Sequence, residues 1–153
     1  MALLYTIRDN IHGNFNQERE SMDHQLGIVV VEDDYIQSYT LKVLLESLNY
    51  KVLGVADSAT KAIEMAEELN PDLILMDIIL NDQMDGIDAA IKIQESSDVQ
   101  IIFITGTNEF YRKRVDKTRF STFLTKPLTK HVLVQALEEC LVTGEINQAP
   151  WEV

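Results

Sequence analysis

The chain has 153 residues and a formal net charge of -12 at pH 7, and hydrophobic residues make up 46% of it. This length and hydrophobic content suit one soluble globular domain with a substantial core, whereas the negative charge argues against direct binding to nucleic acid or to an anionic membrane surface. A single cysteine, Cys140, excludes an internal disulfide, and with no signal peptide or long apolar run we expect a cytoplasmic protein.

Three segments are expected along the chain: an N-terminal extension at residues 1–25, a folded domain at residues 26–143 and a short tail at residues 144–153. The extension becomes polar from Asn10 onward. Four apolar residues near its start are spaced as on one face of a short helix: Leu3, Leu4, Ile7 and Ile11. We expect a loose terminus rather than a docking or dimerisation segment, because chain ends are usually poorly ordered.

From residue 27 onward, short β-branched runs alternate with segments of helical spacing. In chain order we expect strand 28–31, helix 35–48, strand 51–55, helix 59–69, strand 72–76, helix 87–94, strand 100–105, helix 109–117, strand 120–125 and helix 129–142. Ser58 is suited to cap the second helix, and Asn70-Pro71 is suited to end it. The alternation predicts an α/β fold, with a parallel sheet that helices cover on both faces.

Polar side chains follow several of these expected strands. Functional groups in open parallel sheets gather beyond the carboxyl ends of the strands. Five residues stand there, after the first, third, fourth and fifth strands: Glu32, Asp33, Asp77, Thr105 and Lys126. If the strands are neighbours, three carboxylates, a hydroxyl and an ammonium group share one small site.

The residue types at this expected site point to phosphoryl transfer. Crowded carboxylates repel one another unless a cation lies among them, and hard oxygen ligands without histidine or thiolate favour Mg²⁺, or Mn²⁺ in its place. Lys126 would add a second positive charge and Thr105 a hydrogen-bond donor, which suits the charge of a transferred phosphoryl group. Asp77 is the expected nucleophile because it stands alone at the end of the central strand.

Five motifs, in order and at consistent spacing, resemble the response-regulator receiver domain of two-component signalling, the CheY-like family. They are Val30-Val31-Glu32-Asp33-Asp34, Leu75-Met76-Asp77-Ile78-Ile79-Leu80, Met84-Asp85-Gly86, Phe103-Ile104-Thr105-Gly106 and Leu124-Thr125-Lys126-Pro127-Leu128. The resemblance runs from about residue 27 to about residue 142. It implies a flavodoxin-like, doubly wound five-stranded parallel sheet of order 2-1-3-4-5 with five helices.

The resemblance also implies a metal site. Asp77 would be the phosphorylated aspartate, Asp33 a direct Mg²⁺ ligand, and Glu32 a ligand acting through water. The backbone carbonyl of Ile79 would complete the protein ligands. The sequence departs from the commonest family pattern in the loop after Asp77, which is one residue longer and has Asn81 where proline is usual.

The remaining site residues have implied roles in switching. Thr105 and Lys126 would contact the phosphoryl group, and Phe123 matches the aromatic switch position whose rotamer follows the threonine. The family commonly has a cis peptide bond at the position of Lys126-Pro127. The donor would be a histidine kinase or a phosphotransfer protein.

An output surface is implied by the resemblance too. The face made by helix 109–117, strand 120–125 and helix 129–142 would change on phosphorylation and would control binding of an unknown downstream protein or homodimerisation. A basic cluster falls on this face in an otherwise acidic chain: Arg112, Lys113, Arg114, Lys117 and Arg119. A docking patch and an ordinary solvated helix face are equally compatible with it.

Three alternatives remain open from the sequence. A Mg²⁺-dependent phosphatase with an aspartate nucleophile would carry a second acid two residues later, where this chain has Ile79. A flavin-binding module would need an amide-rich loop after the first strand, where this chain has Glu32, Asp33 and Asp34. A receiver-like scaffold that works without phosphorylation is the third. We therefore expect no enzyme activity beyond Mg²⁺-dependent self-phosphorylation and autodephosphorylation.

Overall fold

The computed structural model describes residues 25–106, 109–118 and 121–143. Apart from Gln25, the expected N-terminal extension lies outside the described residues, as does the expected C-terminal tail. The strands are β1 (Gly27–Val31), β2 (Lys51–Ala56), β3 (Leu73–Asp77), β4 (Gln100–Thr105) and β5 (Ser121–Thr125). The helices are α2 (Tyr35–Ser47), α3 (Ala59–Leu69), α4 (Gly86–Gln94), α5 (Glu109–Val115) and α6 (Lys130–Thr143).

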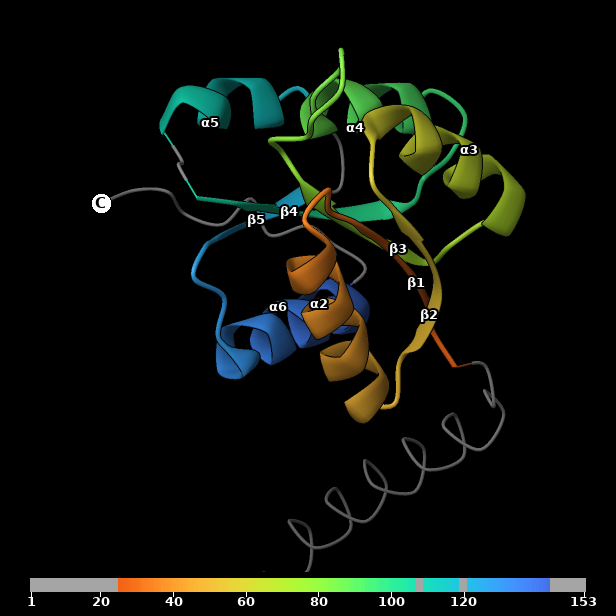
Figure 1. Cartoon of the computed structure of the whole chain (residues 1–153), viewed down its shortest axis with the longest axis vertical. Coiled ribbons are helices and arrows are strands. Elements are labelled where there is room, and N and C mark those ends of the chain that lie inside the picture. The colour runs from red at the N-terminus through yellow and green to blue at the C-terminus, as the bar shows by residue number, and fades with distance from the viewer. Residues whose placement is uncertain (1–24, 107–108, 119–120, 144–153) are drawn as a thin grey trace, which may run out of the picture.

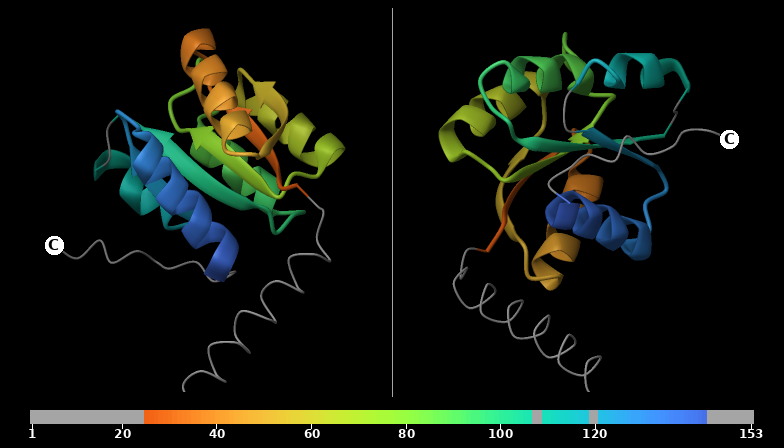
Figure 2. Two further views of the ribbon diagram at one scale, coloured as in Figure 1. Left: turned by 90° about the horizontal axis from the view of Figure 1, so that it is seen from below. Right: turned by 180° about the vertical axis from the view of Figure 1, so that it is seen from behind.

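The five strands form one parallel sheet in the order β2-β1-β3-β4-β5, which confirms the expected flavodoxin-like topology. Helices α2 and α6 cover one face of the sheet, and α3, α4 and α5 cover the other (Figure 1, Figure 2). Because β3 is the central strand, its carboxyl end lies in the middle of the sheet edge.

Two cores follow from the alternation of side chains along each strand. In β1, Ile28 and Val30 point to the core beneath α2 and α6, whereas Val29 and Val31 point to the core beneath α3 and α4. All five residues of β1 and of β3 are buried. Burial on both faces explains why these segments read as continuous apolar runs rather than alternating ones.

The helix ends follow local hydrogen-bonding rules. The side chain of Ser58 accepts a hydrogen bond from the backbone N–H of Lys61 at 3.3 Å, so the predicted cap of α3 is confirmed. Asn70 ends this helix in the left-handed conformation, with φ 46°. Helix α5 ends at Val115, earlier than predicted, because the Thr118 hydroxyl and N–H both donate to the Val115 carbonyl, at 2.7 and 2.8 Å.

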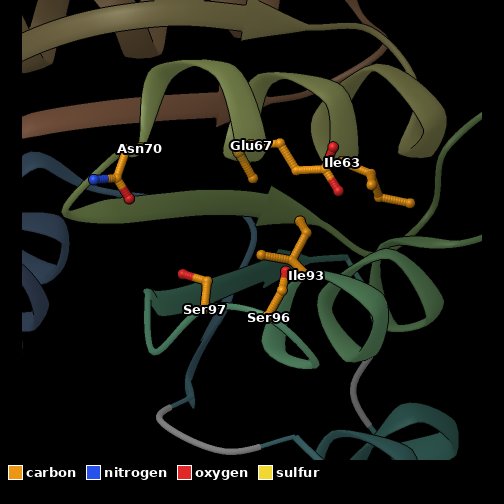
Figure 3. A pocket seen from close by; sticks show the side chains of 7 residues that line it. Ile63, Glu67, Asn70, Ile93, Ser96 and Ser97 are labelled. Atoms are coloured by element: carbon orange, nitrogen blue, oxygen red, sulfur yellow. The ribbon is translucent and has the colours of Figure 1, made fainter.

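A shallow hollow of about 340 Å³ lies between α3 and the end of α4 (Figure 3). Ile63 and Ile93 supply apolar lining, and Glu67, Asn70 and Ser97 supply polar lining. Asn70 ends α3 and Ser97 follows α4, so the hollow lies where β3 and β4 begin. It is therefore at the opposite edge of the sheet from the carboxyl ends of the strands.

Among the described residues, no helix is long and apolar enough to cross a bilayer.

Candidate functional site

The carboxyl ends of β1 and β3 bring three acidic side chains together. Glu32 and Asp33 follow β1, Asp77 is the last residue of β3, and these two strands are direct neighbours. One carboxylate oxygen from each of the three residues lies within 4.8 Å of the others. Glu32 and Asp77 are buried while Asp33 is exposed, so the cluster opens to solvent on one side.

Lys126 reaches this acidic cluster from the end of β5. Its Nζ donates to Asp77 Oδ2 at 2.8 Å, to Glu32 Oε2 at 2.9 Å and to Gln37 Oε1 at 2.8 Å. The backbone N–H of Lys126 donates to the Thr105 carbonyl at 2.7 Å, which ties the strand end to β4. The peptide bond between Lys126 and Pro127 is cis, as the sequence motif predicts.

Gln37 is a site contact that the sequence does not reveal. It lies in the first turn of α2, which Asp34 caps by accepting the backbone N–H of Gln37 at 2.9 Å. The cap fixes the first turn of α2, and the side-chain amide of Gln37 then reaches Lys126. The two residues are 89 positions apart, so no local pattern could have found this contact.

Thr105 ends β4 beside the central strand, and its side chain is fully buried. Among the described residues, its hydroxyl oxygen is the buried side-chain polar atom that has no hydrogen-bond partner. A buried polar group without a partner costs free energy. At the end of β4, the Thr105 hydroxyl is thus a hydrogen-bond donor without an acceptor among the described residues.

Three backbone hydrogen bonds fix the loop between β3 and α4, and two of them reach the acidic cluster. The N–H of Ile79 donates to Asp77 Oδ1 at 3.0 Å, and the N–H of Asn81 donates to Asp33 Oδ2 at 3.1 Å. The N–H of Gly86 donates to the Ile78 carbonyl at 2.9 Å. The longer loop, with Asn81 in the usual place of proline, therefore uses a backbone donor that proline lacks.

Gly86 is required by close approach of two backbone segments. A Cβ atom built at this position would lie 2.1 Å from the carbonyl oxygen of Asp77 and 2.9 Å from the side chain of Met76. Glycine lets the start of α4 pack directly against the end of β3. This contact explains the glycine of the Met84-Asp85-Gly86 motif physically.

The side chain of Phe123 lies inside the molecule. It is buried in β5, in the core that also contains Phe103 and Val115, and Tyr111 of α5 packs against the same core. Phe123 pairs with Phe103 across β4 and β5, two residues before Thr105 along β4. The predicted switch residue and the site hydroxyl are thus on neighbouring strands beneath α5.

Within the basic cluster of the output face, Arg114 is paired with acidic side chains. Its guanidinium is hydrogen-bonded to both oxygens of Asp85 and, at 2.9 Å, to Asp88. Arg114 therefore joins α5 to α4 and is not a free docking charge. Lys113 and Lys117 are exposed, whereas Arg119 and the side chain of Arg112 lie outside the described part of the chain.

The electrostatics of the site reflect its burial and its single ammonium group. Burial raises the pKa of Glu32 above its ordinary value, and the nearby charge of Asp77 adds to this, although the hydrogen bond from Lys126 opposes it. Burial alone would lower the pKa of Lys126, but its bonds to Asp77 and Glu32 raise it instead. Lys126 is therefore firmly cationic at neutral pH.

The residues present fit a divalent cation. One lysine faces three neighbouring carboxylates, and like charges at such distances disfavour full ionisation unless further positive charge is bound. The donors are all hard oxygens, which suits Mg²⁺ or Mn²⁺. The partnerless hydroxyl of Thr105 at the same edge is suited to donate to an anion brought there.

Comparison with known families matches residues 28–138 to the response regulator receiver domain. The chemotaxis protein CheY of Halobacterium salinarum is 31% identical over 117 residues, a match that covers 74% of this chain and 95% of that protein. The sheet order and the acidic cluster point to the same family as these matches do. The chain belongs to the response regulator receiver domain family.

Other relatives extend this comparison. The transcriptional regulatory protein YdfI of Bacillus subtilis (strain 168) is 36% identical over 83 residues, covering 54% of this chain and 38% of that protein. The signal receiver domain of a modulated diguanylate cyclase from Desulfovibrio desulfuricans G20 is 34% identical, with a TM-score of 0.70 over 76% of this chain and 93% of that one. The chain spans between 31% and 54% of the length of the first curated relatives that it matches.

Proposed function

We propose that this receiver domain accepts a phosphoryl group on Asp77 in a Mg²⁺-dependent reaction. The observation that carries the proposal is the cluster of Glu32, Asp33 and Asp77, with Lys126 bonded to two of its members. Asp33, Asp77 and the backbone carbonyl of Ile79 would bind the ion, and Glu32 would bind it through water. The ion would neutralise the oxygens of the incoming phosphoryl group and let the Asp77 carboxylate attack.

The donor in this proposal is a phosphohistidine on a histidine kinase or a phosphotransfer protein. A carboxylate oxygen of Asp77 forms a bond to phosphorus as the bond from phosphorus to the imidazole nitrogen breaks. The nitrogen keeps that electron pair, and the ring leaves as neutral imidazole because its other nitrogen already carries the proton. Lys126 holds one Asp77 oxygen and provides a positive charge for the transferred group. The Thr105 hydroxyl donates to a phosphoryl oxygen.

Switching would follow when the Thr105 hydroxyl gains a hydrogen-bond acceptor. Once its hydroxyl has an acceptor, the end of β4 shifts toward the phosphoryl group, and Phe123 moves in the core beneath α5. The surface formed by α5, β5 and α6 then changes, which alters binding of a downstream protein or homodimerisation. The buried position of Phe123 against the α5 core supports this route. Phosphorylation acts here as a local charge change on a two-state element.

The test is incubation of the full chain with Mg²⁺ and acetyl phosphate, followed by intact-mass analysis. One phosphoryl group should be added to the wild type, and none to Asp77→Asn or to wild type with the metal chelated. Lys126→Gln should be labelled at least about tenfold more slowly, because one charge that stabilises the transferred group is lost.

Asp98→Asn is the matched control. Asp98 is exposed and precedes β4, at the opposite end of the strand from the site, so its labelling should equal that of the wild type. Addition of a phosphoryl group to the Asp77→Asn variant would show that another residue is the acceptor. No labelling of the wild type by acetyl phosphate or by any phosphohistidine donor would favour a scaffold that works without phosphorylation.

A further inference from the structure

Helix α2 carries an apolar stripe that the described residues leave uncovered. Its members recur along one side of the helix and are between 47% and 79% exposed: Tyr35, Ile36, Tyr39 and Val43. The rings of Tyr35 and Tyr39 stack on each other, with their centroids 6.2 Å apart. Single exposed apolar residues need no explanation, but a contiguous stripe of four marks a contact surface.

The described chain begins beside the end of this helix. Gln25 Nε2 donates to the carbonyl of Asn49 at 2.8 Å, and the Lys51 N–H donates to the carbonyl of Leu26 at 3.0 Å. Asn49 lies two residues beyond the end of α2. Residues 1–24 lie outside the described part of the chain, and the point from which they extend, Gln25, is therefore near the C-terminal end of α2.

The sequence of that segment complements the stripe. Its apolar residues follow the spacing of one helix face: Leu3, Leu4, Ile7 and Ile11. As a helix, residues 3–11 would span about 12 Å, the same length as the stripe from Tyr35 to Val43. The intervening residues 12–24 are mostly polar and can extend to about 40 Å, which exceeds the roughly 20 Å length of α2.

We infer that residues 3–11 dock as an amphipathic helix on the apolar stripe of α2 within the same chain. Burial of the aliphatic side chains against Tyr39 and Val43 drives the contact, and tethering makes it intramolecular, at a high effective concentration. The contact gives the N-terminal extension a function as the cover of α2, in contrast to the loose terminus expected from the sequence.

This cover borders the proposed phosphorylation site. The stripe begins at Tyr35, directly after the cap residue Asp34, and Gln37 of the same helix turn is bonded to Lys126. The docking contact itself does not involve Asp77, so it can be tested independently of the proposed function.

Disulfide trapping in the full chain tests the contact directly. Ile7→Cys and Tyr39→Cys place one thiol at the middle of each partner, so the result does not depend on the direction of docking, and Cys140→Ser removes the native thiol. Mild oxidation should give an intramolecular disulfide in monomeric protein. The matched control pairs Ile7→Cys with Phe110→Cys, because Phe110 is more exposed than Tyr39, at 77% against 57%, but lies on α5 across the sheet.

Equal cross-linking of both pairs overturns the inference. A disulfide between chains overturns it too, and identifies a second copy as the occupant. The trapped protein should still be labelled by acetyl phosphate at the rate of its reduced form. Loss of labelling in both forms would count against the proposed function alone, since cross-linking does not depend on Asp77.

Hydrogen exchange provides a second measurement without engineered thiols. Backbone amides of residues 3–11 should exchange about tenfold faster in the double variant Tyr39→Asp, Val43→Asp than in wild type, because charging the stripe removes the docking surface. Phe110→Asp should leave their exchange unchanged. All three substituted residues, Tyr39, Val43 and Phe110, are exposed. The amides of β1 and β3 should therefore keep their protection from exchange in both variants. Equal exchange of residues 3–11 in wild type and the double variant overturns the inference.

Discussion

Arg114 of α5 is hydrogen-bonded to Asp85, the residue whose side chain caps the N-terminus of α4. The same carboxylate accepts the backbone N–H groups of Ile87 and Asp88 at 3.0 Å. One aspartate therefore ends the loop that begins at Asp77 and also anchors α5. Movement of that loop and the position of α5 are mechanically connected through this side chain.

Removing the Arg114 guanidinium should destabilise the domain modestly. The ion pairs are partly exposed, with 34% of the Arg114 side chain and 25% of the Asp85 side chain accessible, so we expect Arg114→Ala to lower the free energy of unfolding by about 1 kcal/mol. Asp85→Ala should cost about 2 kcal/mol, because the cap of α4 is lost as well. Urea unfolding measures both. Lys113→Ala, on the exposed side of α5, should change stability by less than about 0.5 kcal/mol.

Gly86→Ala should be strongly destabilising. Its methyl group would lie 2.1 Å from the Asp77 carbonyl oxygen, which is backbone and cannot rotate away. We expect a loss of at least about 2 kcal/mol in the free energy of unfolding, together with slower labelling by acetyl phosphate because the end of β3 must shift. Gly106→Ala is the control, since nothing lies within 4 Å of its added Cβ. A similar effect of both substitutions would contradict the contact.

Thr105→Val should separate stability from function. The Thr105 hydroxyl is buried without a partner, so replacing it by a methyl group of similar shape should raise the free energy of unfolding by about 1 kcal/mol in the absence of Mg²⁺ and donor. The same change should weaken the response of the α5 surface to phosphorylation. Thr118→Val should instead destabilise, because its hydroxyl donates to the Val115 carbonyl at 2.7 Å. A destabilised Thr105→Val would show that the hydroxyl has a partner in solution.

The contribution of Cys140 to stability should depend on pH. Burial raises the pKa of this thiol, with a smaller effect from Glu139, although the hydrogen bond with Thr122 opposes both. The folded protein then keeps the proton to higher pH than the unfolded chain does. This stability is complete below the unfolded thiol's pKa of about 8.5 and is lost as pH rises above it. The destabilisation caused by Cys140→Ala, measured by urea unfolding, should therefore be smaller at about pH 10 than at about pH 7; an equal cost at both would refute this.

The alternating elements, the parallel sheet and the residues at its edge could all be predicted from the sequence. Strands buried on both faces must be continuously apolar, so runs such as 28–31 and 101–104 were readable directly. Parallel strands place their carboxyl ends together, which was enough to predict that Asp33, Asp77 and Lys126 meet. Helix ends were predicted less accurately, because the turn after Val115 is closed by the hydroxyl and the N–H of Thr118, a local contact that helix propensity does not register.

The pairing of distant side chains depends on the folded packing and could not be predicted. Gln37 meets Lys126 across 89 residues, and Arg114 meets Asp85 across 29, so neither contact leaves a local periodicity to read. A docking patch and a solvated helix face were equally compatible with the charge of Arg114, because a sequence shows the sign of a side chain but not its partner. Exposure is equally invisible in the sequence: only the packing of α2 on the sheet shows that Tyr35, Ile36, Tyr39 and Val43 face outward.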